Sequence, residues 1–275
     1  MTKTTILAEV GVNHNGSLEI ATALIDVAKE AGVDYIKFQK REPRVSVPRS
    51  QWNIPKVTPW GVTMPYIEYK ERMEFHEEEY DQIDAYCKLR GIKWLASAWD
   101  TESVDFLLKY KPDYLKGPSA MATNLPLLKY MRGTGIPIVL STGMCTWEDV
   151  DIAVEIAQPA VLLHCVSTYP CANEELNLRC VTEYQRRYPS IPIGYSGHEV
   201  GLMPTVAAVA LGAVLVERHI TLNRTMKGTD QAASVEPEGL RRLVHYIRQV
   251  EQAMGDGQKR IWESETPNIT KLRTG

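Results

Sequence analysis

The sequence has no long apolar run and no export signal. No stretch of the 275 residues approaches the roughly 20 apolar residues that a membrane-spanning helix requires. Residues 1–5 lead directly into a strand-like run, without the charged start and apolar stretch of a signal peptide. The five cysteines are odd in number and include no CxxC pair, which argues against a disulfide framework or a zinc ribbon. These absences favour a cytoplasmic enzyme.

An excess of charge of one sign is also missing, and so are several catalytic motifs. The formal net charge of −3 at pH 7 gives no electrostatic reason to expect nucleic acid or a membrane as a partner. A local basic pocket for a small anion is compatible with this balance. The sequence has no GxGxxG after its first strand-like run, no GxSxG elbow and no HExxH. These absences argue against a Rossmann domain, a serine hydrolase and a zincin-type protease.

What the sequence does contain is a repeated alternation of strand and helix patterns. Most intervals between its β-branched apolar runs have helical spacing, as in Leu18–Ala31, where Ser17 can cap the first turn and Gly32 can end the helix. Eight repeats over about 250 residues predict a (β/α)₈ TIM barrel. The predicted strands are Ile6–Val12, Tyr35–Gln39, Lys93–Ala98, Tyr114–Lys116, Ile136–Ser141, Ala160–Cys165, Ile191–Ser196 and Ala213–Glu217.

One interval, Lys40–Gly91, is too long for a simple barrel connection. Before its helix, Glu77–Leu89, it holds a stretch of about 35 residues rich in proline, tryptophan, tyrosine and basic side chains. This composition is typical of a lid over a polar ligand, and a surface excursion packed on a partner subunit is the alternative. We expect a catalytic barrel domain over residues 1–254, whose last helix begins at Pro237, and a C-terminal extension or linker over residues 255–275.

Two histidines follow neighbouring predicted strands. His198 and His219 come just after the last two strands, and the segment Glu199–Gly212 between them has helical spacing. In a parallel barrel both imidazoles then lie at the carboxyl ends of the strands, where these barrels hold their chemistry. Two convergent imidazoles with acidic neighbours, here Glu217 and Asp230, suit a divalent metal. We therefore predict that the two histidines are metal ligands.

Polar residues at the other strand ends complete this rim. Lys37 and Gln39 alternate with apolar residues, so both face one side of their strand. A lysine pointing into a barrel is costly unless it meets an anion or a carboxylate such as Glu9, and both readings stay open. His164 and Cys165 are more typical of core residues. The lysines and hydroxyls together predict a cradle for a phosphate and a carboxylate. Its members are Lys37, Lys116, Ser119, Ser141 and Ser196.

The wording of six segments carries a resemblance to a known family. The segments read AEVGVNHNGS, IKFQ, PIVLSTGM, LLHCVSTYP, IGYSGHEVGL and LVERHITL, the last followed by KGTDQAASVEP. They run from Glu9 to Pro237 and resemble the sialic acid synthase (N-acetylneuraminate synthase) family. The resemblance implies a metal-dependent condensation of phosphoenolpyruvate with an open-chain aldose, N-acetylmannosamine or a related sugar. Its products would be phosphate and a 3-deoxy-ulosonic acid extended by three carbons.

The resemblance also implies a role for each site residue. The metal, Mn²⁺ or Mg²⁺, acts as a Lewis acid on the sugar aldehyde and is held by His198 and His219. The implied phosphoenolpyruvate contacts are Lys37, Lys116, Ser119, Ser141 and Ser196, with Ser167 where some members have asparagine. The implied acceptor contacts are Gln39, Tyr169 and Asp230. Glu9 lies near the reacting centre, where it or the metal activates a water, and Glu217 matches an acidic residue near the metal.

The chain departs from the family pattern in two places. Met121 stands where several members have an acidic residue that holds the sugar, and a thioether cannot replace a carboxylate as a hydrogen-bond acceptor. The familiar members continue into an antifreeze-like domain, so this chain is either a natural short form or a truncated one. In a natural short form the lid would close the site. We expect a homodimer, since such barrels often pair by two-fold symmetry. The alternatives are a class II metal aldolase or lyase using pyruvate, and a non-catalytic barrel that binds sugar phosphates.

Overall fold

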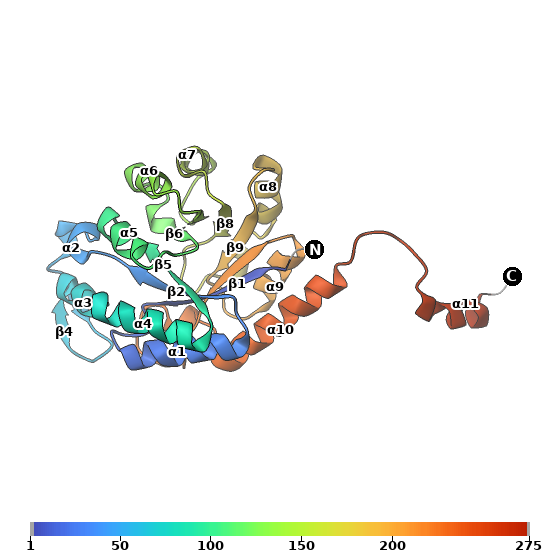
Figure 1. Cartoon of the computed structure of the whole chain (residues 1–275), viewed down its shortest axis with the longest axis horizontal. Coiled ribbons are helices and arrows are strands. Elements are labelled where there is room, and N and C mark those ends of the chain that lie inside the picture. Colours follow the sequence, from blue (N-terminus) through green and yellow to red (C-terminus); the bar gives the residue numbers. More distant parts are fainter. Residues whose placement is uncertain (1–2, 274–275) are drawn as a thin grey trace.

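Eight parallel strands close into a barrel in the computed structural model, which describes residues 3–273 (Figure 1). Around the barrel the strand order is β1-β10-β9-β8-β7-β6-β5-β2. The strands are β1 (Thr5–Gly11), β2 (Tyr35–Lys40), β5 (Lys93–Ala98), β6 (Leu115–Gly117), β7 (Ile138–Ser141), β8 (Val161–Cys165), β9 (Ile193–Gly197) and β10 (Leu215–His219). Each predicted strand is present within two residues at either end. The predicted TIM barrel is confirmed.

Helices follow the strands and cover the outside of the barrel. The first is α1 (Leu18–Ala31), whose Ser17 cap accepts a hydrogen bond from the amide of Ile20 and whose end is Gly32 in the left-handed conformation. It packs beside α4 (Glu77–Arg90) and α10 (Pro237–Ala253) (Figure 1). The other barrel helices are α4 (Glu77–Arg90), α5 (Thr101–Leu108), α6 (Leu125–Gly133), α7 (Trp147–Ala157), α8 (Arg179–Arg187), α9 (Met203–Ala210) and α10 (Pro237–Ala253). Short 3₁₀ turns occur at η2 (Ser119–Met121), η3 (Asn173–Glu175) and η4 (Gln231–Ala233).

The helix predicted over Glu199–Gly212 is shorter in the structure, where α9 begins at Met203. The reason is a long-range contact. The carboxylate of Glu199 is fully buried against Arg218 on the neighbouring strand, with Nη1 3.0 Å from Oε1. The chain must therefore turn inward before the helix begins, and Gly201 has a positive φ of 96° in that turn.

The long segment before α4 has secondary structure of its own, which the sequence analysis did not predict. We call residues 40–76 the lid. It contains α2 (Pro43–Ser46), η1 (Arg49–Gln51), an antiparallel hairpin of β3 (Pro55–Val57) and β4 (Thr63–Pro65), and α3 (Tyr66–Met73). The hairpin and α3 order aromatic and basic side chains on one side of the barrel mouth.

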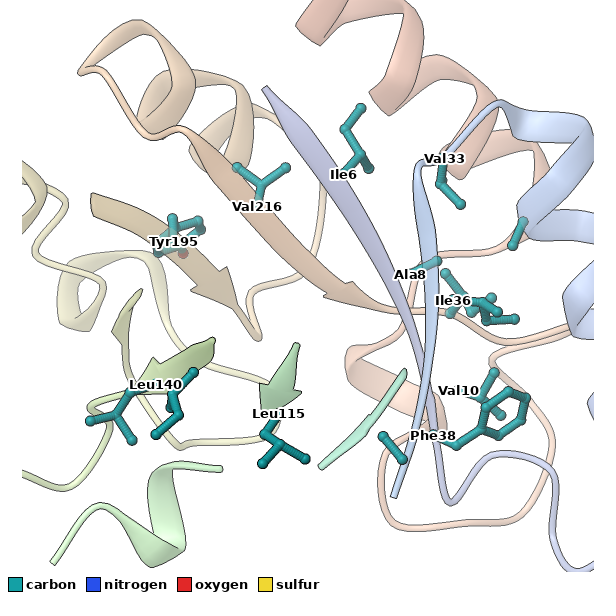
Figure 2. Close-up of a cluster of buried hydrophobic side chains, with 14 of the residues drawn as sticks. Ile6, Ala8, Val10, Val33, Ile36, Phe38, Leu115, Leu140, Tyr195 and Val216 are labelled. Atoms are coloured by element: carbon teal, nitrogen blue, oxygen red, sulfur yellow. The ribbon is translucent and has the colours of Figure 1, made fainter. Parts of the chain in front are cut away.

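Strand alternation divides the core into an outer and an inner layer. Ile6, Ala8 and Val10 of β1 lie with Ile36 and Phe38 of β2 in the outer layer, between strands and helices (Figure 2). The inner layer fills the barrel with Leu7, Leu95, Val139, Val161, Leu163 and Leu215. Side chains alternate between the two faces of a strand. The next inward residue after Leu7 on β1 is therefore Glu9, and the inward residue before Phe38 on β2 is Lys37. The next layer of the barrel interior is therefore charged.

Beyond α10 the chain runs away from the barrel to η5 (Glu263–Glu265) and α11 (Thr266–Leu272) (Figure 1). Ile261, Trp262 and Leu272 on this segment are exposed. Across residues 3–273, the helices are all too short or too polar to cross a bilayer.

Candidate active site

A cavity of about 240 Å³ opens at the carboxyl ends of the barrel strands. It collects most of the side chains that the sequence singles out. The predicted residues that line it are Glu9, Lys37, Gln39, Lys116, Ser119, Ser141, Ser167, Tyr169, Ser196, His198, Glu217 and His219. Asp230 lies beside the cavity, with Oδ2 3.8 Å from Nδ1 of His219. Residues from all eight strands thus converge on one site.

Lys37 lies at the centre of the charged layer. Its Nζ is 2.6 Å from Oε1 of Glu9 and 3.5 Å from Oε1 of Glu217. Burial lowers the pKa of Lys37, but the two carboxylates outweigh it and leave the pKa raised. Burial likewise works to raise the pKa of Glu9, while His219 and Lys37 hold it well below its usual range. The ion pair between Lys37 and Glu9, one of the two readings that the sequence left open, is present. Both residues also line the cavity.

Lys116 is less well neutralised than Lys37. Its Nζ donates to Oγ of Ser141 at 2.7 Å and to the carbonyl of Gly117 at 3.1 Å. Oε2 of Glu217 is 3.8 Å away and has no hydrogen-bond partner within residues 3–273. Burial lowers the pKa of Lys116, and the attraction of Glu217 only partly offsets this. A bound anion would stabilise the charged form of this ammonium group.

The two histidines lie close together on one side of the cavity, with ring centroids 5.4 Å apart. Nδ1 of His198 is 2.7 Å from the carbonyl of Val166, which fixes that edge of the ring and leaves Nε2 for a ligand. Nε2 of His219 is 3.2 Å from Oε2 of Glu9. Its Nδ1 is buried and has no hydrogen-bond partner among the described residues. The ring centroid of Tyr169 lies 4.0 Å from that of His198, with the two planes tilted by 39°.

Glu9 connects the lysine side of the cavity with the histidine side. Besides its contacts with Lys37 and His219, its Oε1 accepts a hydrogen bond of 3.0 Å from the amide of Gln39. Glu217 contacts both lysines, and its Oε1 accepts a bond of 3.3 Å from the hydroxyl of Ser196. Glu217 therefore sits on the lysine side of the cavity. Glu9 is the carboxylate nearest the imidazole of His219.

A wall of hydroxyls lies opposite the carboxylates. Oγ of Ser119 accepts a hydrogen bond of 3.0 Å from the amide of Gly143 and lies 3.4 Å from Sγ of Cys165. Close approach of the backbone explains the glycine: a Cβ at Gly143 would lie 2.2 Å from Oγ of Ser167 and 2.8 Å from Oγ of Ser119. The site thus has room for the two serines only because residue 143 has no side chain.

Sequence reasoning missed several side chains of the cavity wall. Ser97 on β5 and Trp99 just after that strand line the cavity, and the alternation that identified Lys37 and Gln39 could have found them. Cys165, expected to be a core residue, also lines the cavity, with Sγ 3.8 Å from Nδ1 of His198.

Two other residues lie outside the cavity wall. His164 is a core residue as expected, with Nε2 2.7 Å from the carbonyl of Leu176. Met121 packs against the hydrophobic core, and its sulfur accepts from the amide of Asn124 at 3.8 Å.

Comparison with known proteins places these residues in a family. The model of the NeuB family matches residues 24–259. The chain is 41% identical over 273 residues to human N-acetylneuraminate-9-phosphate synthase, covering 97% of this chain and 76% of the relative. It is 33% identical to the N,N'-diacetyllegionaminic acid synthase of Legionella pneumophila, covering 95% and 76%. The crystal structure of an N-acetylneuraminic acid synthetase from Leptospira borgpetersenii superposes with a TM-score of 0.87 at 29% identity, covering 98% and 91%.

Proposed function

Since the chain belongs to the NeuB family, we propose that it condenses phosphoenolpyruvate with an open-chain aldose to give a sialic-type 3-deoxy-ulosonic acid and phosphate. The relatives are named as synthases, and the chain is a transferase that forms a carbon–carbon bond. One observation carries the proposal: two buried ammonium groups and a wall of hydroxyls share a 240 Å³ cavity with two imidazoles. The first set suits a substrate with phosphate and carboxylate groups, and the second suits the activation of an aldehyde.

Phosphoenolpyruvate would lie in the lysine half of the cavity. Lys37 is neutralised by Glu9 and Glu217, whereas Lys116 has only distant carboxylate contact and gains most from an added anion. The hydroxyls of Ser119, Ser141, Ser167 and Ser196 would donate to the phosphate and carboxylate oxygens. Charge stabilisation by such preorganised groups in a water-poor site supplies a large share of catalysis.

The reaction forms one carbon–carbon bond and replaces the phosphate on C2 by a keto oxygen. The C2=C3 electrons of phosphoenolpyruvate form the new bond from C3 to the aldehyde carbon, and the aldehyde oxygen becomes a hydroxyl by taking a proton. Water adds to the cation left at C2 and gives up a proton. The tetrahedral intermediate then expels phosphate by cleavage of its C–O bond, as its C2 hydroxyl loses a proton and becomes the keto group. Glu9 is ionised and lies between the two halves of the cavity, so its Oε2 can accept a hydrogen bond from this water and orient it.

The histidines fit a divalent metal, Mn²⁺ or Mg²⁺. The buried, unpartnered Nδ1 of His219 and the backbone-fixed ring of His198 offer donors for such an ion. When bound, the ion would polarise the aldehyde oxygen as a Lewis acid. Among residues 3–273 no group of three or more His, Cys, Asp or Glu side chains is arranged around a metal position. Substrate oxygens or water would therefore fill the other coordination positions.

The acceptor would approach from the histidine side. We propose Gln39, Tyr169 and Asp230 as its contacts, since the first two line the cavity and the third lies beside His219. Relatives are named for N-acetylneuraminate 9-phosphate, diacetyllegionaminic acid and pseudaminic acid. These products share the phosphoenolpyruvate-derived end and differ in the acceptor-derived end. N-acetylmannosamine or a related aldose is the acceptor class that follows.

Phosphate release from phosphoenolpyruvate tests the proposal. With Mn²⁺ and a panel of aldoses we expect sugar-dependent release that EDTA abolishes. Lys37→Met should lower kcat by about 10²–10³, the usual cost of removing one preorganised electrostatic partner. The exposed Lys129→Met on α6 is the matched control and should retain wild-type kcat.

Other outcomes would point to another function. Condensation of pyruvate without phosphate release would identify an aldolase. If phosphoenolpyruvate binds but no sugar supports turnover, the chain is a binding barrel.

A further inference from the structure

The loop between β10 and α10 carries Asp230 but has little regular structure to hold it. Residues 220–236, all within the described chain, contain only η4 and a single bridge between Ile220 and Val235. The side chain of Asp230 nevertheless has a defined place, with Oδ2 3.8 Å from Nδ1 of His219. A loop of this length gives one position to a carboxylate only where other contacts offset its conformational entropy. Buried polar side chains supply those contacts.

Asn13, just after β1, ties the two ends of this loop together. It is 1% exposed, and its Nδ2 donates to the carbonyl of Ile220 at 2.8 Å and to Oγ of Ser234 at 2.8 Å. A carbonyl can only accept a hydrogen bond, so the amide nitrogen and not Oδ1 must face Ile220. Both N–H groups of the side chain are then used. One side chain thus bonds to the first residue of the loop and to a residue near its end.

Ser234 and Gln231 extend the contact from Asn13 to Asp230. The serine hydroxyl that accepts from Asn13 donates in turn to the carbonyl of Asp230 at 2.7 Å, so the three groups form one chain of hydrogen bonds. Bonds in such a chain strengthen one another. Nε2 of the buried Gln231 donates to the carbonyl of Asn13 at 3.2 Å, and its Oε1 accepts from the hydroxyl of Thr221. Asp230 is therefore held through its own carbonyl and through the residue that follows it.

The segment that carries this asparagine is held in place as well. The ring of His14 stacks on that of Phe75 at the end of the lid, with ring centroids 4.1 Å apart. Nδ2 of Asn15 donates to the carbonyl of Lys227 at 3.0 Å, which is a further link to the loop after β10. The segment between β1 and α1 therefore contacts both the lid and that loop. The amide that holds Asp230 thus sits on a base that is supported from two sides.

We propose that Asn13 is a positioning residue for the acceptor aldose. Through Ser234 and Gln231 it holds the carboxylate of Asp230 in place, and this role rests on the proposed function, in which Asp230 contacts that acceptor. Within the described chain these three positioning residues are not part of the cavity wall, so they act through Asp230 and do not touch substrate. The lysines proposed to bind phosphoenolpyruvate lie on β2 and β6, whereas this group joins the ends of β1 and β10. Loss of the group should weaken acceptor binding and leave phosphoenolpyruvate binding unchanged.

Steady-state kinetics of Ser234→Ala test the proposal. The variant cuts the chain between Asn13 and Asp230 without changing a residue of the cavity wall. With the aldose that gives the fastest phosphate release in the wild type, we expect the KM for that aldose to rise about two- to tenfold, the range for one lost hydrogen bond. The KM for phosphoenolpyruvate should stay unchanged. Ser234→Thr keeps the hydroxyl and should recover most of the loss, and the exposed Ser190→Ala is the matched control that should keep both KM values.

A double variant shows whether Ser234 acts through Asp230. Asp230→Ala should raise the KM for the aldose by itself. In that background Ser234→Ala should add no further rise, since both changes remove the same contact with the acceptor. A further rise of equal size, or an equal rise in the KM values of both substrates, would overturn the positioning role while leaving the condensation reaction intact.

Failure of the reaction itself is a separate result. No phosphate release by the wild type with any aldose would overturn the proposed function and the positioning role with it. If Ser234→Ala does not fold, Gln231→Met decides in its place, because it removes the bond to the carbonyl of Asn13 from the residue beside Asp230. The same rise in the KM for the aldose is then expected, and an unchanged KM would overturn the proposal.

Discussion

At the scale of single residues, the cavity depends on positions where a side chain is absent. Gly11 ends β1 with φ +55°, and a Cβ there would lie 2.9 Å from the ring of His219 and 3.3 Å from Oδ2 of Asp230. Gly143 has the same function towards Ser119 and Ser167. Such glycines allow the backbone to approach the functional groups closely. Their replacement should affect the site before it affects the fold.

We expect Gly143→Ala to raise the KM for phosphoenolpyruvate about tenfold, because the methyl group displaces two hydroxyls that would bind its charged groups. Steady-state phosphate release at varied phosphoenolpyruvate concentration measures this effect. Gly133→Ala is the matched control, since a Cβ at Gly133 meets nothing within 4 Å. A KM unchanged in Gly143→Ala would show that Ser119 and Ser167 do not contact this substrate.

At the scale of elements, the connection between β9 and α9 positions His198. Glu199, the next residue, accepts hydrogen bonds from Tyr195 at 2.9 Å and Thr205 at 2.7 Å, in addition to its ion pair with Arg218. Arg218 also donates to the carbonyl of Glu199 at 2.6 Å. This buried network joins two strands and one helix at the point where a proposed metal ligand leaves the barrel. The network therefore stabilises the fold and also fixes the position of His198.

Glu199→Gln should lower the free energy of unfolding by about 3–5 kcal/mol, because it leaves the buried Arg218 without a charged partner. Urea unfolding followed by circular dichroism measures the change. The exposed Glu155→Gln on α7 is the control and should stay within about 0.5 kcal/mol of wild type. A loss below about 1 kcal/mol in Glu199→Gln would mean that the amide is fully accommodated and that the charge is dispensable.

At the scale of the whole molecule, binding in a cavity built from all eight strands should stabilise the entire barrel. A ligand that binds only the folded state at 100 times its dissociation constant adds about 2.7 kcal/mol of stability. For a chain of this size each kcal/mol corresponds to about 2–4 °C in Tm. A ligand that contacts only a few strand ends still stabilises the whole barrel, because the closed sheet couples all eight strands.

We therefore expect saturating phosphoenolpyruvate with Mn²⁺ to raise Tm by about 5–10 °C in differential scanning calorimetry, and EDTA to remove part of that rise. A double variant, His198→Ala with His219→Ala, should keep the rise in Tm that phosphoenolpyruvate causes without metal. It should lose the further rise in Tm that EDTA removes in the wild type. An EDTA effect of equal size in the double variant would show that the metal is bound elsewhere.

How far the sequence predicts this protein is clearest at particular residues. The positions of Lys37, Lys116, His198 and His219 around one cavity follow from strand recognition alone, because all parallel strands of a barrel end on one face. The predicted start of α9 at Glu199 is wrong. The contact of Glu199 with Arg218, 19 residues further along the chain, outweighs local helix propensity. The secondary structure of the lid was missed because its short hairpin and helix are stabilised by aromatic packing across the segment.

The sequence by itself determined the barrel, the inward direction of each polar side chain and the face on which they meet, because a period of two and a closed parallel sheet leave no other arrangement. Only the tertiary structure decided which charges pair. It placed Lys37 against Glu9 and Glu217, left Lys116 with a carboxylate contact of only 3.8 Å, and brought Arg41 onto Trp99. These choices depend on distances between segments far apart in the chain. Such distances are set by packing of the whole molecule rather than by any local pattern.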